Sequence, residues 1–418
     1  MKLSTLSLLF ALIILSNASK EDHWAVLVAG SNGYWNYRHQ ADICHAYQIV
    51  KKNGIPEDQI IVFAYDDIAS NSQNPFPGKI FNKPDGDDVY AGCKIDYKGS
   101  DVTPAKFLSV IKGEGSGKVL KSNSKSKVFI NFSDHGAPGL IAFPSDELYA
   151  EDLHTAFVDM NQKQMYEEMT VYIEACESGS MFDKILEENI NIYATTAANP
   201  TESSWATYCS PDDTVQGTHI GSCLGDEYSV NWMEDTDAHE SKICSYSLSS
   251  QFDAVKQSTH DSHVMEYGDV KFKSEAIGAF QGTCDATSAV GGFLKQISDA
   301  YTPTKKRTSI DSRFAKMDYL YHKYMRTQSI EDADALEAEI ANRRKIEERF
   351  EDIRSKANIV PSNNSDIKDF ACYKQLVNSY KGSCGLDEYD LGFLHNFVSM
   401  CNSGMNSNDM ISLVKSNC

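Results

Sequence analysis

One stretch of the sequence, Lys127-Val128-Phe129-Ile130-Asn131-Phe132-Ser133-Asp134-His135-Gly136, decides the fold prediction. Its first seven residues are rich in apolar β-branched and aromatic side chains, which predicts a buried strand. A polar turn containing glycine follows directly. In open parallel α/β sheets, the side chains just beyond the strand ends line the ligand-binding crevice. The stretch therefore predicts both a buried sheet strand and a candidate site residue, His135, at the edge of that sheet.

Four further apolar runs are expected to be strands: 24–30, 59–65, 170–175 and 190–195. Helical segments separate them. One of these segments repeats apolar side chains over residues 43–50, and another begins with Thr103 as N-cap and Pro104 at the first position. Nearly continuous apolar strands that alternate with helices indicate an α/β protein with a mainly parallel sheet covered on both faces.

The chain has 418 residues, long enough for two domains, and its formal net charge of −20 argues against nucleic acid or an anionic membrane as its main partner. Residues 1–18 are expected to be a cleaved signal peptide, because Lys2 is followed by an apolar run and then by small residues. The alternative is an ordinary buried N-terminal helix. No later stretch has the ~20 apolar residues of a transmembrane helix, so we expect a soluble protein of the secretory pathway.

The composition changes near residue 285, which predicts a second domain. We assign 19–285 to the catalytic domain, 286–329 to a linker or activation segment and 330–418 to a helical C-terminal domain, with residues 284–310 an exposed linker. Four of the eleven cysteines fall within 372–418. They indicate a disulfide framework and not a metal site, because they contain no C-x2-C pair.

A cysteine follows the 170–175 strand, in the run Cys176-Glu177-Ser178-Gly179-Ser180. Parallel strands would bring Cys176 and His135 to the same edge of the sheet, where a thiol and an imidazole form a nucleophile and its base. The backbone N–H groups of Gly136 and Cys176 could then stabilise an oxyanion. Singly, each residue is more often structural: a buried cysteine filling space, or a histidine with satisfied hydrogen bonds.

Several motifs together resemble the legumain family, the asparaginyl endopeptidases or vacuolar processing enzymes. The resemblance runs from about Asp22 to Gln281 and resumes at the tail cysteines. It implies a caspase-like fold, a six-stranded sheet between helices, and a death-domain-like prodomain. The motifs are Gly30-Ser31-Asn32-Gly33, Asn36-Tyr37-Arg38-His39-Gln40-Ala41-Asp42, Ser133-Asp134-His135-Gly136, Glu174-Ala175-Cys176-Glu177-Ser178-Gly179-Ser180 and Tyr193-Ala194-Thr195-Thr196-Ala197-Ala198-Asn199-Pro200.

The resemblance also implies roles for single residues. Cys176 would be the nucleophile, His135 the base and Asn36 the group that orients the imidazole. Asp134 would form a succinimide in some members, the alternative being a loop aspartate that caps local backbone. The primary specificity pocket would consist of Arg38, His39, Glu174, Ser203 and Asp226.

Such a pocket suits asparagine, because a guanidinium can face the amide oxygen while carboxylates face the NH2 group. Aspartate would be accepted only when acid protonates it. Without the resemblance, Arg38 and Asp226 would be interpreted as a surface ion pair.

The resemblance pairs Cys209 with Cys223, Cys372 with Cys401 and Cys384 with Cys418, although four tail cysteines alone allow three connectivities. The remaining cysteines, Cys44, Cys93, Cys244 and Cys284, stay unassigned. Cys44 lies on the apolar side of its helix and is expected to be a buried free thiol. Asn363 begins a glycosylation sequon in a predicted loop.

The prodomain would cap the active site at neutral pH, with its basic residues Arg343, Arg344, Lys345 and Arg349 facing carboxylates of the enzyme. Acid would protonate those carboxylates and release the cap. Where animal members carry an Asn-Thr self-cleavage site, this chain has Arg326-Thr327. Self-cleavage could instead follow Asp311, Asp318 or Asn342, or another protease could cut at Lys305, Lys306 or Arg307.

The leading functional hypothesis is a secreted cysteine endopeptidase zymogen that cuts after asparagine. The alternatives are a peptide ligase on the same site and a catalytically inactive binding or inhibitor protein. No cofactor and no metal are expected. The expected partners are peptide substrates with asparagine before the scissile bond, the chain's own prodomain and cystatin-type inhibitors. We expect a monomer that is either secreted or sent to the lysosome or vacuole.

Overall fold

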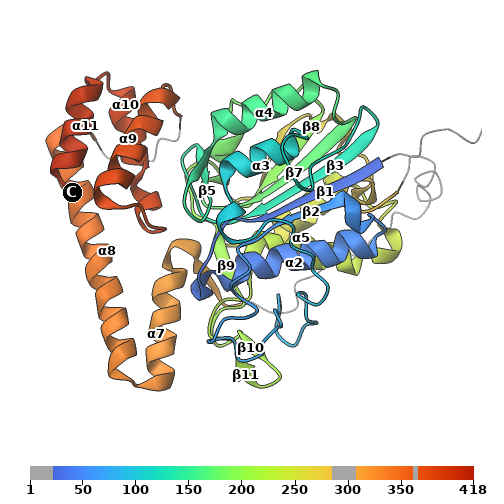
Figure 1. Ribbon diagram of the computed structural model, residues 1–418, viewed down its shortest axis with the longest axis horizontal. Helices are drawn as coiled ribbons and strands as arrows, with labels where there is room; N and C mark the ends of the chain where they lie inside the picture. The colour runs from blue at the N-terminus through green and yellow to red at the C-terminus, as the bar shows by residue number, and fades with distance from the viewer. Residues whose placement is uncertain (1–21, 285–306, 361–365) are drawn as a thin grey trace, which may run out of the picture.

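The computed structural model describes residues 22–284, 307–360 and 366–418 (Figure 1). The predicted signal peptide, Lys305, Lys306 and the Asn363 sequon lie outside these residues.

A six-stranded sheet forms the centre of the molecule, with the strand order β2-β1-β3-β7-β8-β13. The first five strands run parallel, and β13 joins β8 antiparallel at one edge. This confirms the predicted mainly parallel sheet. The strands are β1 (Asp22–Ala29), β2 (Ile60–Phe63), β3 (Ser126–Ser133), β7 (Glu168–Glu174), β8 (Ile192–Thr196) and β13 (Met265–Gly268).

Helices cover both faces of this sheet (Figure 1). On one face, α3 (Pro104–Ile111) and α4 (Ala150–Gln162) pack onto alternate strand side chains such as Val128 and Ile130. On the other face, α2 (Tyr37–Lys52), α5 (Glu227–Ala238) and α6 (Leu248–Ser258) pack onto the residues between them, such as Phe129. Burial on both faces explains why these strands are continuously apolar.

Local signals set the helix ends, and the N-cap of α3 is the one predicted. Thr103 caps α3, its Oγ1 accepting the backbone N–H of Lys106 at 3.2 Å. Helix α2 stops at Asn53, after which Gly54 adopts a φ of 101°. That left-handed value favours glycine.

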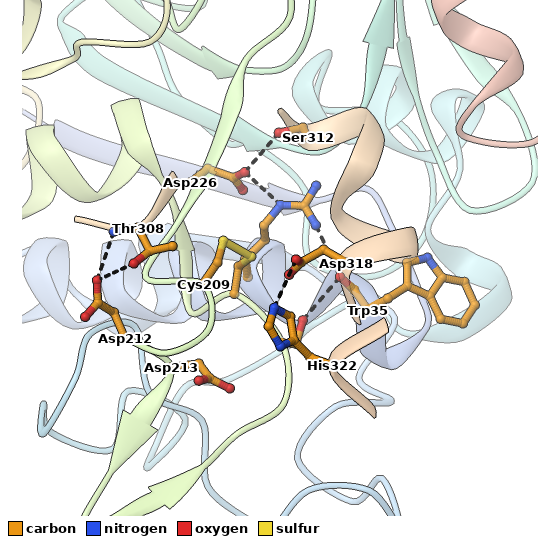
Figure 2. Close-up of a disulfide and its surroundings, with 12 residues drawn as sticks. Trp35, Cys209, Asp212, Asp213, Asp226, Thr308, Ser312, Asp318 and His322 are labelled. Carbon is orange, nitrogen blue, oxygen red and sulfur yellow. Dashed lines mark hydrogen bonds and ion pairs between the residues drawn. A yellow bond between two sulfur atoms is a disulfide. The ribbon is translucent and has the colours of Figure 1, made fainter. Parts of the chain in front are cut away.

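Two three-stranded sheets extend the catalytic region near the carboxyl ends of the parallel strands. One contains β4 (Gly136–Ala137), β5 (Leu140–Ala142) and β6 (Glu147–Tyr149). The other contains β12 (Gly225–Asp226), β9 (Trp205–Thr207) and β14 (Ser309–Asp311). The short hairpin of β10 (Thr214–Val215) and β11 (Thr218–His219) lies beside the second sheet (Figure 2).

The C-terminal region is helical, as predicted. It contains α8 (Ile330–Ala357), α9 (Phe370–Cys384), α10 (His395–Asn402) and α11 (Ser407–Ser416). Its apolar core is continuous with Ala137, Leu140 and Tyr149 of the β4-β5-β6 sheet. The helical region is therefore packed onto the catalytic region at this small sheet.

The predicted exposed linker over 284–310 is wrong where the structure describes it. Cys284 is buried, and residues 309–311 form β14, which pairs antiparallel with β9. Helix α7 (Ala315–Thr327) then packs along α8. The polar composition misled the prediction, because backbone pairing to an existing strand needs no apolar side chains.

All ten cysteines other than Cys176 form disulfides. The three pairings implied by the resemblance are present, and Cys244 pairs with Cys284. The expectation that Cys44 is a free thiol is wrong, because it pairs with Cys93. The apolar side of α2 faces the segment that carries Cys93, so burial and pairing coincide.

No helix in the described part of the chain combines the length and the apolar character that crossing a membrane requires.

The Cys44–Cys93 disulfide joins residues 49 positions apart. Replacing both cysteines by serine should lower the free energy of unfolding by about 2–4 kcal/mol, because the unfolded chain regains loop entropy. Urea unfolding followed by tryptophan fluorescence measures this. The Cys209→Ser/Cys223→Ser variant, whose disulfide spans 14 positions, serves as the matched comparison and should lose less. An unchanged unfolding midpoint in the Cys44 variant would contradict the expectation.

Candidate active site

The candidate residues gather where β1, β3 and β7 end. In the parallel register, Ser133 lies opposite both Ala29 and Glu174. The pairing continues past the strand ends, since the Asp134 N–H donates to the Glu174 carbonyl at 3.1 Å. The chain runs from β1 to β2 on one side of β1, and it then crosses back to form β3 on the other side. This edge is therefore a topological switch point, where α/β proteins bind ligands.

Cys176 lies on a sharp turn two residues beyond the end of β7. Glu177 adopts the left-handed conformation with φ 49°, unusual for a residue with a side chain, and a short 3-10 helix follows. Gly136 lies directly against this turn, because a Cβ on Gly136 would be 2.3 Å from the Cys176 carbonyl oxygen. The His135–Gly136 turn and the Cys176 turn are therefore in contact.

The Cys176 thiol is buried in this state and is the one free cysteine. It accepts the Ser204 N–H at 3.3 Å and lies 3.7 Å from the Ser204 Oγ. Burial raises the pKa of the thiol to about 11, although Arg313 opposes the shift. The sulfur is thus held as an unreactive thiol.

His135 is hydrogen-bonded to Asn36, the residue that the resemblance places beside it. The His135 Nε2 lies 3.0 Å from the Asn36 Oδ1. An amide oxygen only accepts hydrogen bonds, so the Nε2 donates and the Nδ1 is left without a proton. Asn36 is in turn fixed by its own donation to the Asn32 carbonyl at 3.2 Å.

Four of the residues expected to form the specificity pocket make a buried charged group between the start of α2 and the ends of β7 and β12. The Arg38 Nε donates to the Asp226 Oδ1 at 2.8 Å, and its Nη1 donates to the Trp35 carbonyl and the Asn36 Oδ1. Glu174 accepts the Ser229 N–H at 2.9 Å through Oε2. Two atoms remain buried without a hydrogen-bond partner: the Arg38 Nη2, a donor, and the Glu174 Oε1, an acceptor. The Arg38–Asp226 pair is fully buried, so the surface ion-pair interpretation is wrong.

His39 and Asp134 lie between the pocket and His135. Burial, Arg38 and His135 lower the pKa of His39 well below its usual range, so this imidazole stays neutral. Burial raises the pKa of Asp134 to about 7 despite the nearby His135 and Arg38. His39, Asp134 and His135 offer ligand atoms within 4.8 Å of one another, close enough to hold a metal ion. Two of them already have partners, since His39 bonds Ser31 and His135 bonds Asn36.

The segment that begins at Arg307 covers the site and adds strand β14 to the sheet of β9. After β14 pairs with β9, the Ser312 N–H donates to the Ser204 carbonyl at 3.1 Å. Ser312 then reaches Asp226 at 3.5 Å, while Thr308 is held by Asp212 (Figure 2). Ser203 does not line an empty pocket, because its Oγ accepts from the Arg313 Nε at 3.3 Å.

Arg313 forms an ion pair with Glu177, the residue after Cys176. Its guanidinium passes over Gly392 of the helical region, where a Cβ would be 3.1 Å from the Arg313 Cδ. The Arg313 carbonyl accepts the Arg343 Nη2 at 2.9 Å. The covering segment is therefore fixed from the catalytic side and from the helical side.

The helical region also contributes an acid to the catalytic residues. Glu388 accepts the Trp35 Nε1 at 3.0 Å and the Asn36 Nδ2, and it lies 3.5 Å from the His135 Nε2. Burial disfavours its charge, but His135 and the hydrogen bonds from Trp35 and Asn36 outweigh that effect and lower the pKa of Glu388 to about 2.

The basic residues expected to face carboxylates of the catalytic region have other partners or are exposed. Arg343 pairs with Glu339 of its own helix and Arg349 donates to Tyr380, while Arg344 and Lys345 are exposed. The basic residues that contact acidic side chains of the catalytic region lie on α9 and not on α8. There, Lys374 contacts Glu151 and Asp152, and Lys381 contacts Asp146 and Glu147.

The residues proposed as cleavage sites have hydrogen-bond or ion-pair partners. The Asp311 carboxylate accepts the Arg313 N–H at 2.9 Å, Asp318 pairs with His322 (Figure 2), and Asn342 donates to Asp387. Arg307 pairs with Glu234. By contrast, residues 325–328, which include Arg326, are exposed at the C-terminal end of α7.

Sequence reasoning missed Ser204, Glu388 and Arg313. Ser204 adjoins the predicted Ser203, but no sequence pattern indicates which of the two serines contacts the Cys176 sulfur. Glu388 and Arg313 are single charged residues far from the motifs, so only tertiary contact reveals them.

Comparison with known proteins agrees with this architecture. The Peptidase C13 family matches residues 23–283, and the legumain prodomain family matches residues 334–418. The vacuolar-processing enzyme delta-isozyme of Arabidopsis thaliana is 39% identical over 430 residues, covering 96% of this chain and 91% of that protein. Human legumain is 39% identical over 405 residues, covering 91% of this chain and 89% of that protein. Mouse legumain is 52% identical over 267 residues, covering 62% of this chain and 59% of that protein.

A caspase-1 structure from Spodoptera frugiperda aligns with a TM-score of 0.38 at 10% identity, covering 64% of this chain and 92% of that chain, a likeness too low to add to the fold described above. The family matches and the long matches to legumains settle the assignment: this chain belongs to the legumain family of C13 cysteine endopeptidases and carries the legumain prodomain after its catalytic region.

Proposed function

We propose that the chain is the zymogen of an endopeptidase that cuts after asparagine, and after aspartate in acid. One observation carries the proposal. The buried pocket holds one donor without a partner, the Arg38 Nη2, and one acceptor without a partner, the Glu174 Oε1. Unpaired buried polar atoms are costly, so their presence points to a ligand that satisfies both.

An asparagine side chain supplies the missing partners. Its amide oxygen would accept from Arg38, and its NH2 group would donate to Glu174. An ionised aspartate has no hydrogen to donate and would be repelled by the pocket carboxylates. Protonation gives it the missing hydrogen, so turnover after aspartate should require acid.

The catalytic step follows from Cys176 and His135 at neighbouring strand ends. The Cys176 sulfur attacks the scissile carbonyl carbon while His135 holds the thiol proton. The proton then passes to the leaving amine, and a thioester remains. Water, activated by His135, hydrolyses the thioester and restores the thiol. The N–H groups of Gly136 and Cys176 would bind the oxyanion.

In the zymogen, the covering segment and the helical domain block this chemistry. Residues 309–311 pair with β9 along the site, and Arg313 forms an ion pair with Glu177, the residue after Cys176. Glu388 bonds Asn36 and approaches His135, so the base is occupied by an acid of the prodomain. Access to Cys176 requires that both covers leave.

Acid would favour release through Glu388. Its pKa is lowered to about 2 when docked, whereas a free glutamate has a pKa of about 4.3. The carboxylate therefore stabilises docking above the free value, and this stabilisation is lost as the pH falls toward 2. Glu177 has the opposite effect. Burial raises the pKa of its carboxyl to about 7 despite Arg313, so acid favours the covered state at this residue. The release pH reflects the balance of the two.

A peptide ligase on the same site is the second candidate. An incoming amine would replace water in attacking the thioester, and Asp134 as a succinimide could take part. An inactive binding protein is disfavoured, because the thiol, the imidazole and the pocket are all present. We also propose a monomeric state, inhibition by cystatin-type proteins and a lysosomal, vacuolar or secreted location. The name of the vacuolar-processing enzymes that the chain resembles supports the vacuolar location.

Matched peptides with asparagine or aspartate at the cleaved position test the specificity. After acid treatment, we expect asparagine cleavage over a broad pH range, and aspartate cleavage that falls as the pH rises. The Cys176→Ala variant, incubated with processed wild-type enzyme to release its prodomain and then purified, should lose roughly 10³-fold or more in kcat/KM. Liquid chromatography with mass detection follows the products, including cyclised peptide from ligation. Aspartate turnover that does not fall with pH would contradict the pocket assignment.

Alkylation of Cys176 tests whether the thiol is blocked in the zymogen. At pH 7.5 we expect reaction with iodoacetamide roughly 100-fold slower before acid processing than after it, because burial raises the thiol pKa and limits access. Timed intact-mass measurements should show one added group per chain. The urea-unfolded zymogen provides the control for full reactivity. Equal rates in the two states would argue against the block.

The Glu388→Gln variant tests the acid release. Glutamine keeps an oxygen for Trp35 and Asn36 but carries no charge, so docking loses its charge-dependent stabilisation. The midpoint of acid activation should move toward neutral pH by about half a unit or more. Glu348→Gln, an exposed change on α8, is the matched control and should leave the midpoint in place. A Glu388 variant that activates at the wild-type pH rules out this contact as the acid-sensitive element.

A further inference from the structure

A third carboxyl, Asp42, lies behind the specificity pocket and has no role in the assignments above. It follows Arg38 by one turn of α2, so both side chains lie on the same side of the helix. Asp42 is completely buried. A buried carboxyl at this position, next to a site already rich in carboxylates, requires a reason.

Asp42 holds the strand that carries Asp226. Its Oδ1 accepts from the Asn82 Nδ2 at 2.7 Å and from the Asp226 N–H at 3.4 Å. The amide orientation of Asn82 is fixed, because its Nδ2 also donates to the Leu224 carbonyl at 3.0 Å. Gly225 permits this approach, since a Cβ there would be 3.1 Å from the Asp42 Oδ1.

One hydroxyl connects Asp42 to the pocket carboxylate. The Ser133 Oγ lies 3.1 Å from the Asp42 Oδ2 and 3.5 Å from the Asp226 Oδ2. Ser133 is the last residue of β3, so the central sheet fixes the position of this bridge. The two carboxyls are thereby coupled through a single polar hydrogen.

The buried group contains more acid than base. The charged or titratable groups that act on Asp42 are Asp226 from β12, Glu174 from β7 and Arg38 from its own helix, while His39 lies against Asp226. With His39 neutral, three carboxyls share one guanidinium. Full ionisation would leave a net charge of −2 out of contact with water, which favours retention of protons. Burial, Asp226 and Glu174 raise the pKa of Asp42 well above its usual range.

We propose that Asp42 is a positioning residue of the specificity pocket, which fixes Asp226 and sets the pH at which the pocket stops accepting an aspartate side chain. This rests on the proposed function. When Asp42 carries a proton, the pocket is less negative and tolerates an acidic ligand. When Asp42 loses that proton, the added negative charge repels aspartate but leaves the neutral asparagine amide recognised.

The Asp42→Asn variant tests the proposal, because asparagine keeps the shape and cannot become negative. Its Oδ1 can accept from Asn82 and Asp226, and its NH2 group can donate to Ser133. The ratio of kcat/KM for aspartate to that for asparagine peptides is measured against pH on acid-processed enzyme. We expect the midpoint at which this ratio falls to move to higher pH by about half a unit or more. A midpoint that stays in place or moves down overturns the proposal.

Two further variants separate this role from a structural one. Asp235→Asn removes another buried carboxyl, on α5, which Gln251 and Tyr246 bond, and it should leave the midpoint unchanged. Ser133→Ala keeps Asp42 but deletes the bridging hydroxyl, and it should raise the midpoint because the carboxylates lose a hydrogen bond. It replaces the first test if Asp42→Asn does not fold, and no upward shift in Ser133→Ala then overturns the proposal.

The two levels of inference fail differently. Processed wild-type enzyme that cleaves neither peptide refutes the proposed function. A wild-type ratio that falls with rising pH at the same midpoint as in Asp42→Asn, or a shift in Asp235→Asn equal to that in Asp42→Asn, overturns only the role of Asp42.

Discussion

The site depends on the parallel register of β1, β3 and β7. Because Ser133 lies opposite both Ala29 and Glu174, the three strands end at the same position along the sheet. The next residues then place His135 and Cys176 on adjoining turns, while the chain after β1 enters α2 with Asn36, Arg38 and His39. A register shift of one residue between β1 and β3, or between β3 and β7, would turn Ser133 or Glu174 to the opposite face of the sheet. The buried group around Arg38 would then not form.

A second constraint is the charge imbalance behind the pocket. Burying Asp42, Glu174 and Asp226 around Arg38 is unfavourable for stability alone, since paired charges rarely recover their desolvation cost. In the proposed function the arrangement would discriminate, because it leaves one donor and one acceptor for a carboxamide and would repel a carboxylate. Selectivity and pH sensitivity would then arise from the same buried groups.

The covering elements use the surfaces that a substrate would need. Residues 309–311 pair with β9, Arg313 forms an ion pair with Glu177, and Glu388 accepts a hydrogen bond from Asn36, which also bonds His135. The apolar contact of the helical domain with the β4-β5-β6 sheet supplies adhesion. Polar contacts lie both at the Cys176 and His135 turns, through Arg313 and Glu388, and on α9, through Lys374 and Lys381. The apolar contact and the cover over Cys176 therefore lie in different parts of one interface.

The sequence by itself determined the five parallel strands, the covering helices, the cap of α3 and the placement of Cys176 and His135 at strand ends. Apolar runs and turn residues are local signals, and parallel topology brings strand ends together. Tertiary structure alone decided the partner of Cys44, the pairing of residues 309–311, the role of α9 in place of α8, and the contacts of Arg313, Glu388 and Asp42. Each of these joins residues far apart in the chain. A single charged or thiol side chain carries no periodic signal, so its partner is fixed only by which surfaces the folded chain brings into contact.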